Sequence, residues 1–419
     1  MLVFKVFTVP GPDVTHDVLI IYQGWFEALK SGIFPPHDVT WQYPPAAALA
    51  ILSPGLLPSL HYDAGFYVMV CAADALTMAL LLYAGRRGGP RAGVWVWVAG
   101  IALLGPTAYA RYDVMVTAVA VAALLAAARR PRTAGVLAGL GAMLKVWPVL
   151  VLLGMPRGRA TRRSWTMAVL TAAALTAGFA LSMPGALAFL SYQTDRGTEV
   201  ESLGALVFHV ARHFGWDGQV LLNYGSVEFL GPYVDLVSNA ALALNALALG
   251  WLLLWRLRAR AWSAATPADA AFTAVLLFTV TSRVISPQYT VWLVGVAAVC
   301  LTVRGSRMAL PAVLVVLATG VTLVEFPLWF GHVVASDWEG LLVLAVRNGL
   351  LAAAALIACV RLWRATVSGR EPAPRRPRYR PRHGPDSARA RGQRRGHEQG
   401  QEQAEFSRAP APDSRATTP

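Results

Sequence analysis

Residues 16–45 read HDVLIIYQGWFEALKSGIFPPHDVTWQYPP, a polar-studded stretch that precedes an almost unbroken series of apolar segments. In its middle, apolar and polar side chains recur near helical spacing, which predicts an amphipathic helix lying on a membrane surface. Gly32 ends this helix, and Pro35 and Pro36 prevent its continuation. The apolar face comprises Val18, Ile21, Phe26 and Leu29, and the polar face comprises Gln23, Glu27 and Lys30.

Carboxylates and histidines bracket this predicted helix. They give an interfacial pocket the groups that proton transfer requires. The alternative is a solvated loop in which these side chains take no part in chemistry. The residues concerned are Asp13, Asp17, Asp38, His16 and His37.

The composition is that of a polytopic membrane protein. Of the 419 residues, 56% are hydrophobic and 14% are charged, whereas a soluble globular protein carries about 25% charged residues. The cysteines Cys71, Cys300 and Cys359 lie far apart in apolar runs. This spacing indicates small core residues and neither a disulfide framework nor a metal cluster.

The net charge of +14 indicates membrane topology and not nucleic-acid binding. Residues 364–419 hold 13 Arg and 6 acidic residues, and most of the other basic residues fall in short loops between apolar segments. Loops of this kind are cytoplasmic under the positive-inside rule. The basic clusters are Arg86, Arg87 and Arg91; Arg129, Arg130 and Arg132; Arg157 to Arg163; Arg256 to Arg260; Arg304 and Arg307; and the tail.

The apolar segments predict an all-α fold with about nine to eleven transmembrane helices, because each crossing needs about 20 apolar residues. Two shorter apolar segments flank the polar step from Ser282 to Gln288. The full-length spans are expected near residues 62–84, 93–110, 112–128, 164–183, 233–255, 308–326 and 338–361.

Two segments are expected to be re-entrant, which means that they enter the membrane and leave on the same side. Residues 133–154 have basic clusters at both ends, and Lys145 marks their turning point. Residues 44–60 are too short to cross and are bounded or broken by prolines. If neither segment crosses the membrane, the count of crossings between the basic loops places residues 16–45 and 184–232 together on the outer face.

The two ends of the chain differ from its middle. Residues 1–363 are expected to form the integral membrane domain, with a truncated first helix, because MLVFKVFTV is too short to span. Residues 364–419 are rich in Pro, Arg, Gln, Gly and Ser, which predicts a disordered basic tail on the cytoplasmic side.

In the second outer loop, Arg196 lies close in sequence to Glu199 and Glu201. The planar guanidinium of arginine makes two charge-assisted hydrogen bonds to a phosphate at once, so this loop is a candidate phosphate site. The alternative is an ordinary salt bridge within the loop.

Two further polar sites lie at membrane depth. Arg283 and Gln288 flank a Ser286-Pro287 step between two apolar runs, and polar groups there are costly enough to indicate a site. The alternative is that Pro287 simply caps a helix. Lys145 lies inside an apolar hairpin, where its ammonium needs an anion or must extend to the interface.

No P-loop, Rossmann glycine pattern, HExxH motif or paired CxxC occurs in the sequence. Nothing in the chain therefore requires a nucleotide or a metal, and no cofactor is predicted.

Six motifs follow one another along the chain: an acidic residue ahead of a juxtamembrane helix (Asp17), SGIFPPHDVTWQYPP, RYD at Arg111 to Asp113, LKVWP at Leu144 to Pro148, RGTEVES at Arg196 to Ser202, and SPQYTVWL at Ser286 to Leu293. In order and spacing they resemble glycosyltransferase family 87, of the GT-C class, which includes polyprenol-phosphate-mannose-dependent mannosyltransferases of actinobacterial type. The resemblance covers most of residues 13–360. The departures are the truncated first helix and the Arg283-Val284 lead into the last motif.

The resemblance implies a GT-C-like fold and a catalytic base in the first outer loop, which is Asp17 by motif position, with Asp13 close by. Arg196, together with Lys145 or Arg283, would stabilise the departing lipid phosphate. The other candidate substrate-binding residues are Gln288, Glu201, Tyr43 and His16.

The predicted function is transfer of a hexose, by resemblance mannose, from a polyprenyl-phosphate sugar to a lipid or glycan acceptor at the outer face of the plasma membrane. A single displacement with one base would invert the anomeric centre. Donor, acceptor and membrane lipids are the expected partners, without nucleic acid. The alternative is a lipid or lipid-linked-sugar transporter or flippase, because buried cations and broken helices also build substrate pathways. Transfer is favoured because no inverted repeat relates two halves of the sequence.

Overall fold

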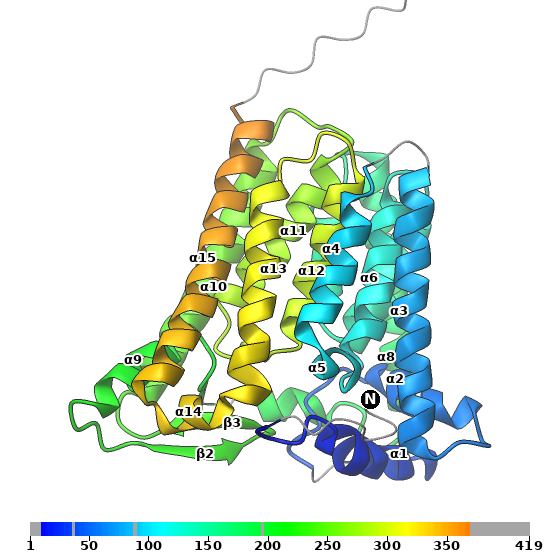
Figure 1. The fold of residues 1–419 in the computed structure, drawn as a ribbon. Coiled ribbons are helices and arrows are strands. Elements are labelled where there is room, and N and C mark those ends of the chain that lie inside the picture. Colours follow the sequence, from blue (N-terminus) through cyan, green and yellow to red (C-terminus); the bar gives the residue numbers. More distant parts are fainter. Residues whose placement is uncertain (1–9, 36–37, 87–89, 194–196, 369–419) are drawn as a thin grey trace, which may run out of the picture. The chain divides into compact units, whose positions relative to one another are not determined.

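The computed structural model describes residues 10–35, 38–86, 90–193 and 197–368 (Figure 1). Outside the described residues lie residues 1–9, where a truncated first helix is expected, the phosphate candidate Arg196, His37 and residues 369–419. Within them the chain is mostly helical, which confirms the prediction of a polytopic membrane protein.

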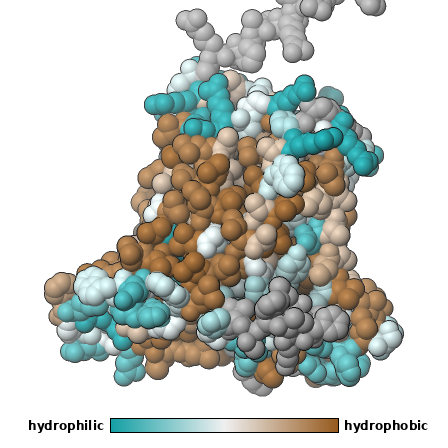
Figure 2. Space-filling model, viewed as in Figure 1, coloured by the Kyte–Doolittle hydropathy of each residue, from teal (hydrophilic) through white to brown (hydrophobic). Residues whose placement is uncertain are grey.

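Among the described residues, five helices are long and apolar enough to cross a membrane. On the face seen in Figure 2, apolar side chains cover the middle of the protein over α13 and α15. In α8 only 11% of the most apolar window is buried inside the protein, so most of this helix is left to face lipid. The five are α3 (Tyr62–Arg86), α8 (Arg159–Ser182), α10 (Val234–Arg258), α13 with its continuation η5 (Ala309–Leu328) and α15 (Trp338–Thr366).

Shorter apolar helices pack inside this set, and α12 is buried along almost its whole length. A helix of 13–15 residues reaches only about 20 Å, whereas the hydrocarbon core is about 30 Å thick. Non-helical backbone at Gly105, Lys145 and Thr281–Gln288 follows α4, α7 and α11. The short helices are α4 (Ala92–Leu104), α6 (Asp113–Ala127), α7 (Pro131–Leu144), α11 (Thr266–Val280) and α12 (Tyr289–Thr302), and the single turn α5 (Pro106–Tyr109) follows α4.

The loops that carry the arginine clusters meet at one end of the helices, which we call the basic end. The guanidinium of Arg157 donates hydrogen bonds to the carbonyl oxygens of Arg256 and Leu257, and Arg361 donates to the carbonyl oxygen of Arg307. These contacts join the Arg157–Arg163 cluster to the Arg256–Arg260 cluster, and the loop of Arg304 and Arg307 to α15. They agree with the prediction that the clusters share one side of the membrane.

Residues 131–158 begin and end at the basic end. This course is compatible with the re-entrant segment expected at residues 133–154, whose place in the membrane stays a prediction. Helix α7 runs parallel to α8, because Gly135 packs against Ser164 and Gly139 packs against Ala168. The chain turns at Lys145, whose backbone is extended, and returns through the 3₁₀ turns of η3 (Trp147–Leu152).

The opposite end holds the short elements, and we call it the loop end (Figure 1). A three-stranded antiparallel sheet of order β1-β3-β2 forms here, which the all-α prediction did not include. Residues 44–60 fold into short turns beside α1 and α3 and do not cross. The elements are η1 (Asp17–Tyr22), α1 (Gln23–Lys30), α2 (Ala47–Leu52), η2 (Ser53–Leu56), η4 (Ala188–Gln193), β1 (Thr198–Glu199), α9 (Ala205–Arg212), β2 (Gln219–Asn223), β3 (Ser226–Leu230), η5 (Val324–Leu328) and α14 (Phe330–Ala335).

The helix predicted in residues 16–45 is present as η1 and α1, and it ends at Gly32, which has a positive φ of 85°. Its most buried side chains are Val18, Tyr22, Trp25 and Leu29, whereas Ile21 and Phe26 are only partly buried. The prediction counted only aliphatic residues and Phe as apolar and so missed the aromatic face of Tyr22 and Trp25. That face packs against protein, since Trp25 contacts Trp41 edge to face.

Candidate active site

Asp17 begins η1, and Arg111 holds its carboxylate. Nη2 of Arg111 lies 3.0 Å from Oδ2 of Asp17. Nη1 of the same guanidinium donates to the carbonyl oxygens of Val14, at 3.1 Å, and Ala110, at 2.7 Å. The side chain of Arg111 is 11% exposed and that of Asp17 is 31% exposed. Asp17 is therefore a fixed carboxylate that a ligand can still reach.

Lys145 follows the last residue of α7, and its ammonium lies within a group of aromatic rings that we call the aromatic cage. Nζ lies 5.0–5.4 Å from four ring centroids, within range of cation–π attraction. Lys145 is 8% exposed, so its side chain does not extend to the surface. The cage consists of Tyr43, Tyr112, Tyr289 and Trp292.

Asp113, the first residue of α6, is the anion that Lys145 requires. Its Oδ1 accepts hydrogen bonds from Nζ of Lys145, at 2.7 Å, and from Nε1 of Trp292, at 2.6 Å. Its Oδ2 is buried and has no hydrogen-bond partner among the described residues. The charge of Lys145 is thus already paired, and an incoming phosphate would share this ammonium with Asp113.

The RYD motif connects the two ion pairs. Arg111 pairs with Asp17, and two residues later Asp113 pairs with Lys145. Between them, the ring of Tyr112 contacts Tyr22 of η1, at a centroid distance of 6.0 Å, and also forms part of the aromatic cage. The accessible carboxylate of Asp17 and the buried ammonium of Lys145 therefore belong to one continuous cluster.

The RGTEVES and SPQYTVWL motifs meet at the loop end. The backbone N–H of Glu199 donates to the carbonyl of Arg283 at 3.1 Å. The Glu199 carboxylate accepts from the N–H of Ile285, at 2.5 Å, and from the hydroxyl of Ser286, at 2.9 Å. The carbonyl of Ser286 in turn accepts from the N–H of Tyr289, a cage residue. Glu199 therefore holds the non-helical segment Arg283–Ser286, which leads into α12 and its cage residue Tyr289.

Glu201, a predicted substrate ligand, lies in a buried ionic cluster with Arg347 and Glu325. Nη1 of Arg347 lies 3.5 Å from Glu201 and 2.6 Å from Glu325, and Nη2 donates to the carbonyl of Ile285 at 2.7 Å. Burial and the neighbouring Glu325 carboxylate raise the pKa of Glu201 well above its usual range. These surroundings favour a structural role for Glu201.

The backbone next to Arg196 is fixed by Glu228. Its buried carboxylate accepts hydrogen bonds from the N–H of Gly197, at 2.9 Å, and from the side chains of Asn223 and Ser226. The side chain of Arg196 lies outside the described residues, so its role as a phosphate ligand stays a prediction.

The remaining predicted residues occupy different surroundings. The partly buried Arg283 donates to the hydroxyl of Ser238 at 3.3 Å, and Gln288 directly precedes α12. His16 is exposed beside Asp17. The neighbouring acid Asp13 accepts hydrogen bonds from the N–H and the hydroxyl of Thr15, which stabilises the start of the helix.

Asp38, the third acid that brackets the helix, has a structural environment. Its Oδ2 accepts from Nε1 of Trp25 at 2.7 Å, and its Oδ1 accepts from the N–H and the hydroxyl of Thr40. Of the three acids proposed for proton transfer, Asp17 is therefore the one joined to the aromatic cage through the RYD motif.

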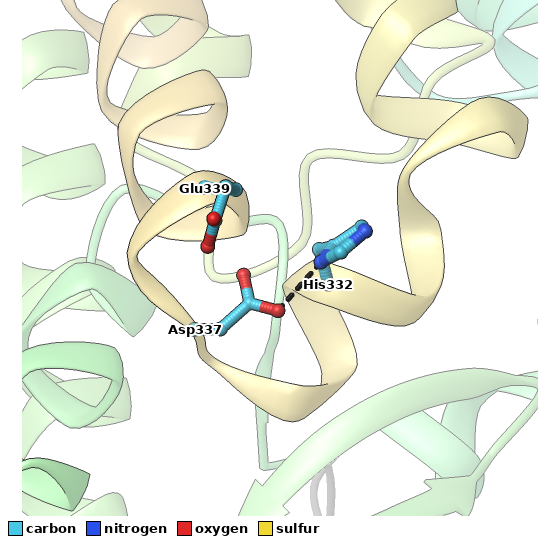
Figure 3. Close-up of side chains that lie close together, drawn as sticks. All are labelled: His332, Asp337 and Glu339. Carbon is cyan, nitrogen blue, oxygen red and sulfur yellow. Dashed lines mark hydrogen bonds and ion pairs between the residues drawn. The ribbon is translucent and has the colours of Figure 1, made fainter.

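One group of described side chains has the composition of a metal site: His332, Asp337 and Glu339 (Figure 3). Asp337, however, caps α15 by accepting from the N–H of Gly340 at 2.9 Å, and its other oxygen lies 2.6 Å from Nδ1 of His332. These hydrogen bonds and the histidine lower the pKa of Asp337. The N-terminal cap of α15 and the hydrogen bond between Asp337 and His332 account for the positions of these two side chains.

The sequence analysis did not identify the ion-pair partners of Asp17, Lys145 and Glu201, which are Arg111, Asp113 and Arg347. Arg111 and Asp113 lie within the RYD motif. Charged residues at the edge of an apolar segment are costly, which is the sequence signal for a role of these two side chains. The same signal was present in Glu325 and Arg347, which interrupt the last two apolar spans.

Comparison with known families decides the class of protein. The model of glycosyltransferase family 87 matches residues 41–287, which is more than half of the chain. The protein belongs to glycosyltransferase family 87. The match includes the RYD motif, Lys145 and Arg283, whereas Asp17 lies ahead of it. No curated protein and no solved structure matches this family 87 member.

Proposed function

We propose that this family 87 glycosyltransferase transfers a hexose, mannose by family resemblance, from a polyprenyl-phosphate sugar to a lipid or glycan acceptor. The reaction takes place at the loop end, which we assign to the outer face of the plasma membrane. The observation that carries the proposal is the accessible Asp17, held 3.0 Å from Arg111 and joined through one motif to the buried Lys145–Asp113 pair.

In this mechanism Asp17 accepts the proton of the acceptor hydroxyl. The hydroxyl oxygen forms the new bond to the anomeric carbon while the bond from that carbon to the phosphate oxygen breaks. The polyprenyl phosphate departs with the bonding electron pair, and a single displacement inverts the anomeric centre. A positioned general base contributes on the order of a hundred- to ten-thousand-fold in rate.

Cationic groups near Asp17 stabilise the departing phosphate. Arg111 lies beside the carboxylate, and Lys145 lies within the aromatic cage, paired with Asp113 of the same RYD motif. A fixed cation placed where negative charge develops stabilises the transition state without reorganisation. Arg196 and Arg283 remain candidates for the same phosphate.

The test is transfer of radiolabel from polyprenyl-phosphate mannose to a lipid extract by the purified protein. Label should appear in a new glycolipid. Asp17→Asn should reduce this rate at least a hundred-fold, because the amide cannot accept the proton. Asp13→Asn, the matched control, should change it by less than about three-fold, since the amide oxygen of asparagine can still accept the hydrogen bonds from the N–H and the hydroxyl of Thr15.

A flippase would behave differently. It would move labelled donor across liposomes without forming a glycolipid, and that result would overturn the proposal. If Asp13→Asn abolishes transfer while Asp17→Asn does not, the base is Asp13 and the mechanism holds with the other carboxylate.

A further inference from the structure

A hollow at the basic end, far from the candidate active site along the chain, is lined by arginines from two elements. Its volume is about 380 Å³, within the range of small-molecule sites. The loop before α13 supplies one side, and the last turns of α15 supply the other. The lining residues are Ser306, Arg307, Ala309, Arg361 and Arg364.

The guanidinium groups of three arginines line this hollow: Arg307, Arg361 and Arg364. Arg361 donates to the carbonyl of Arg307 at 2.5 Å, which ties the two sides together. Among the described residues, the side chains of Arg307 and Arg364 form no hydrogen bond or close ion pair. The nearby acid is Asp269, whose carboxylate accepts from the hydroxyl of Ser306, at 2.6 Å, and from the N–H of Arg307, at 3.3 Å. That carboxylate fixes the loop and leaves a net positive charge.

We propose that this hollow binds a phosphate group. Arginine forks match phosphate oxygens, and basic pockets between transmembrane helices hold anionic lipid headgroups. A lipid is the natural source, because apolar side chains that adjoin the hollow in sequence face outward on both helices. Leu310 is 43% exposed, and Val360 is 47% exposed. The acyl chains would lie along these side chains, and the apolar surface in Figure 2 continues toward this end.

The experiment measures binding to the purified full-length protein in a neutral detergent at physiological salt. The probes are dioctanoyl phosphatidic acid, dioctanoyl phosphatidylcholine and inorganic phosphate. The test variant is Arg307→Gln/Arg361→Gln/Arg364→Gln. The matched control is Arg159→Gln/Arg162→Gln/Arg163→Gln, which removes three exposed arginines at the same end but outside the hollow.

The unsubstituted protein should bind phosphatidic acid more tightly than phosphatidylcholine. The hollow variant should weaken phosphatidic acid binding at least ten-fold, since each basic residue near a phosphate contributes about five-fold. The control should weaken it less than three-fold. Stronger binding of phosphatidic acid than of inorganic phosphate would identify a lipid as the source, whereas equal binding would identify a soluble phosphate.

Equal losses in the two triple variants would overturn the proposal, because the effect would then be general surface charge. Absence of binding to the unsubstituted protein would overturn it as well. If the hollow variant does not fold, the single variants Arg364→Gln and Arg163→Gln are compared instead. Both side chains are exposed.

Discussion

Arg111 is the residue whose replacement best tests how the base is positioned. Its guanidinium reaches Asp17 and two backbone carbonyls at once, at 2.7–3.1 Å. Arg111→Lys keeps the charge but loses the planar fork, so a single ammonium cannot hold all three partners. We expect transfer to slow by about ten- to a hundred-fold, the cost of a base misplaced by roughly 1 Å.

The measurement is the transfer rate as a function of pH in protein that elutes normally by size. A positioning role predicts a lower rate at every pH, because the base is misplaced whatever the pH. Arg159→Lys, exposed at the basic end, is the control and should behave like the unsubstituted protein. A rate for Arg111→Lys within two-fold of normal would mean that other contacts hold Asp17.

For single residues, the sequence predicts which side chains belong to the site but not which residues they pair with. Lys145 was recognised because an ammonium in an apolar hairpin is costly. That it pairs with Asp113 depends on how α6 packs against α7, and spacing along the chain does not encode this packing. Glu201 was nominated for lying near Arg196 in sequence. Its ion pair with Arg347 arises from a helix at the other end of the chain.

Helix α9 is the element whose attachment should depend on pH. Nε2 of His209 donates to the carbonyl of Val200, at 2.8 Å, and Nδ1 accepts from the hydroxyl of Ser336, at 2.7 Å. Burial lowers the pKa of His209 to about 4. The unfolded histidine titrates near 6.5. The folded state therefore binds fewer protons between these values, and stability present above pH 6.5 is lost as the pH falls toward 4.

The expected loss at pH 5 is roughly 2 kcal/mol of unfolding free energy. Thermal melting of the purified protein at pH 7.5 and pH 5 should detect it. His209→Gln should melt lower at pH 7.5 but lose less on acidification, because glutamine does not titrate. The control is His213→Gln, an exposed ring stacked on Trp338, which should retain the full acid loss. If His209→Gln and the unsubstituted protein lose equal stability, another group causes the acid sensitivity.

Elements with a strong apolar period were predictable, and those defined by long-range pairing were not. The span expected at residues 62–84 is α3, because length and hydropathy alone decide such a helix. The re-entrant turn at Lys145 followed from charge parity. The sheet was not foreseen, since β1 has two residues and exists only through its pairing with β3, where Thr198 lies opposite Phe229.

For the whole molecule, the testable claim is the side of the membrane on which each end lies. The gathering of the arginine loops at one end predicts that this basic end is cytoplasmic and that the loop end is external. In intact cells, an impermeant thiol reagent should label a cysteine introduced at Asp217, which is exposed at the loop end. It should not label a cysteine introduced at Arg132 or Arg163, which are exposed on either side of the re-entrant segment.

Arg132 and Arg163 together test the re-entrant segment, and Asp217 against Arg163 tests the orientation. The background variant replaces the exposed Cys71 with Ala so that its thiol does not contribute. Permeabilised cells should label all three positions, which shows that each thiol can react. Labelling of Arg132→Cys but not Arg163→Cys from outside would mean that residues 133–154 cross the membrane. Labelling of both but not of Asp217→Cys would invert the protein and move the proposed transfer reaction to the cytoplasmic face.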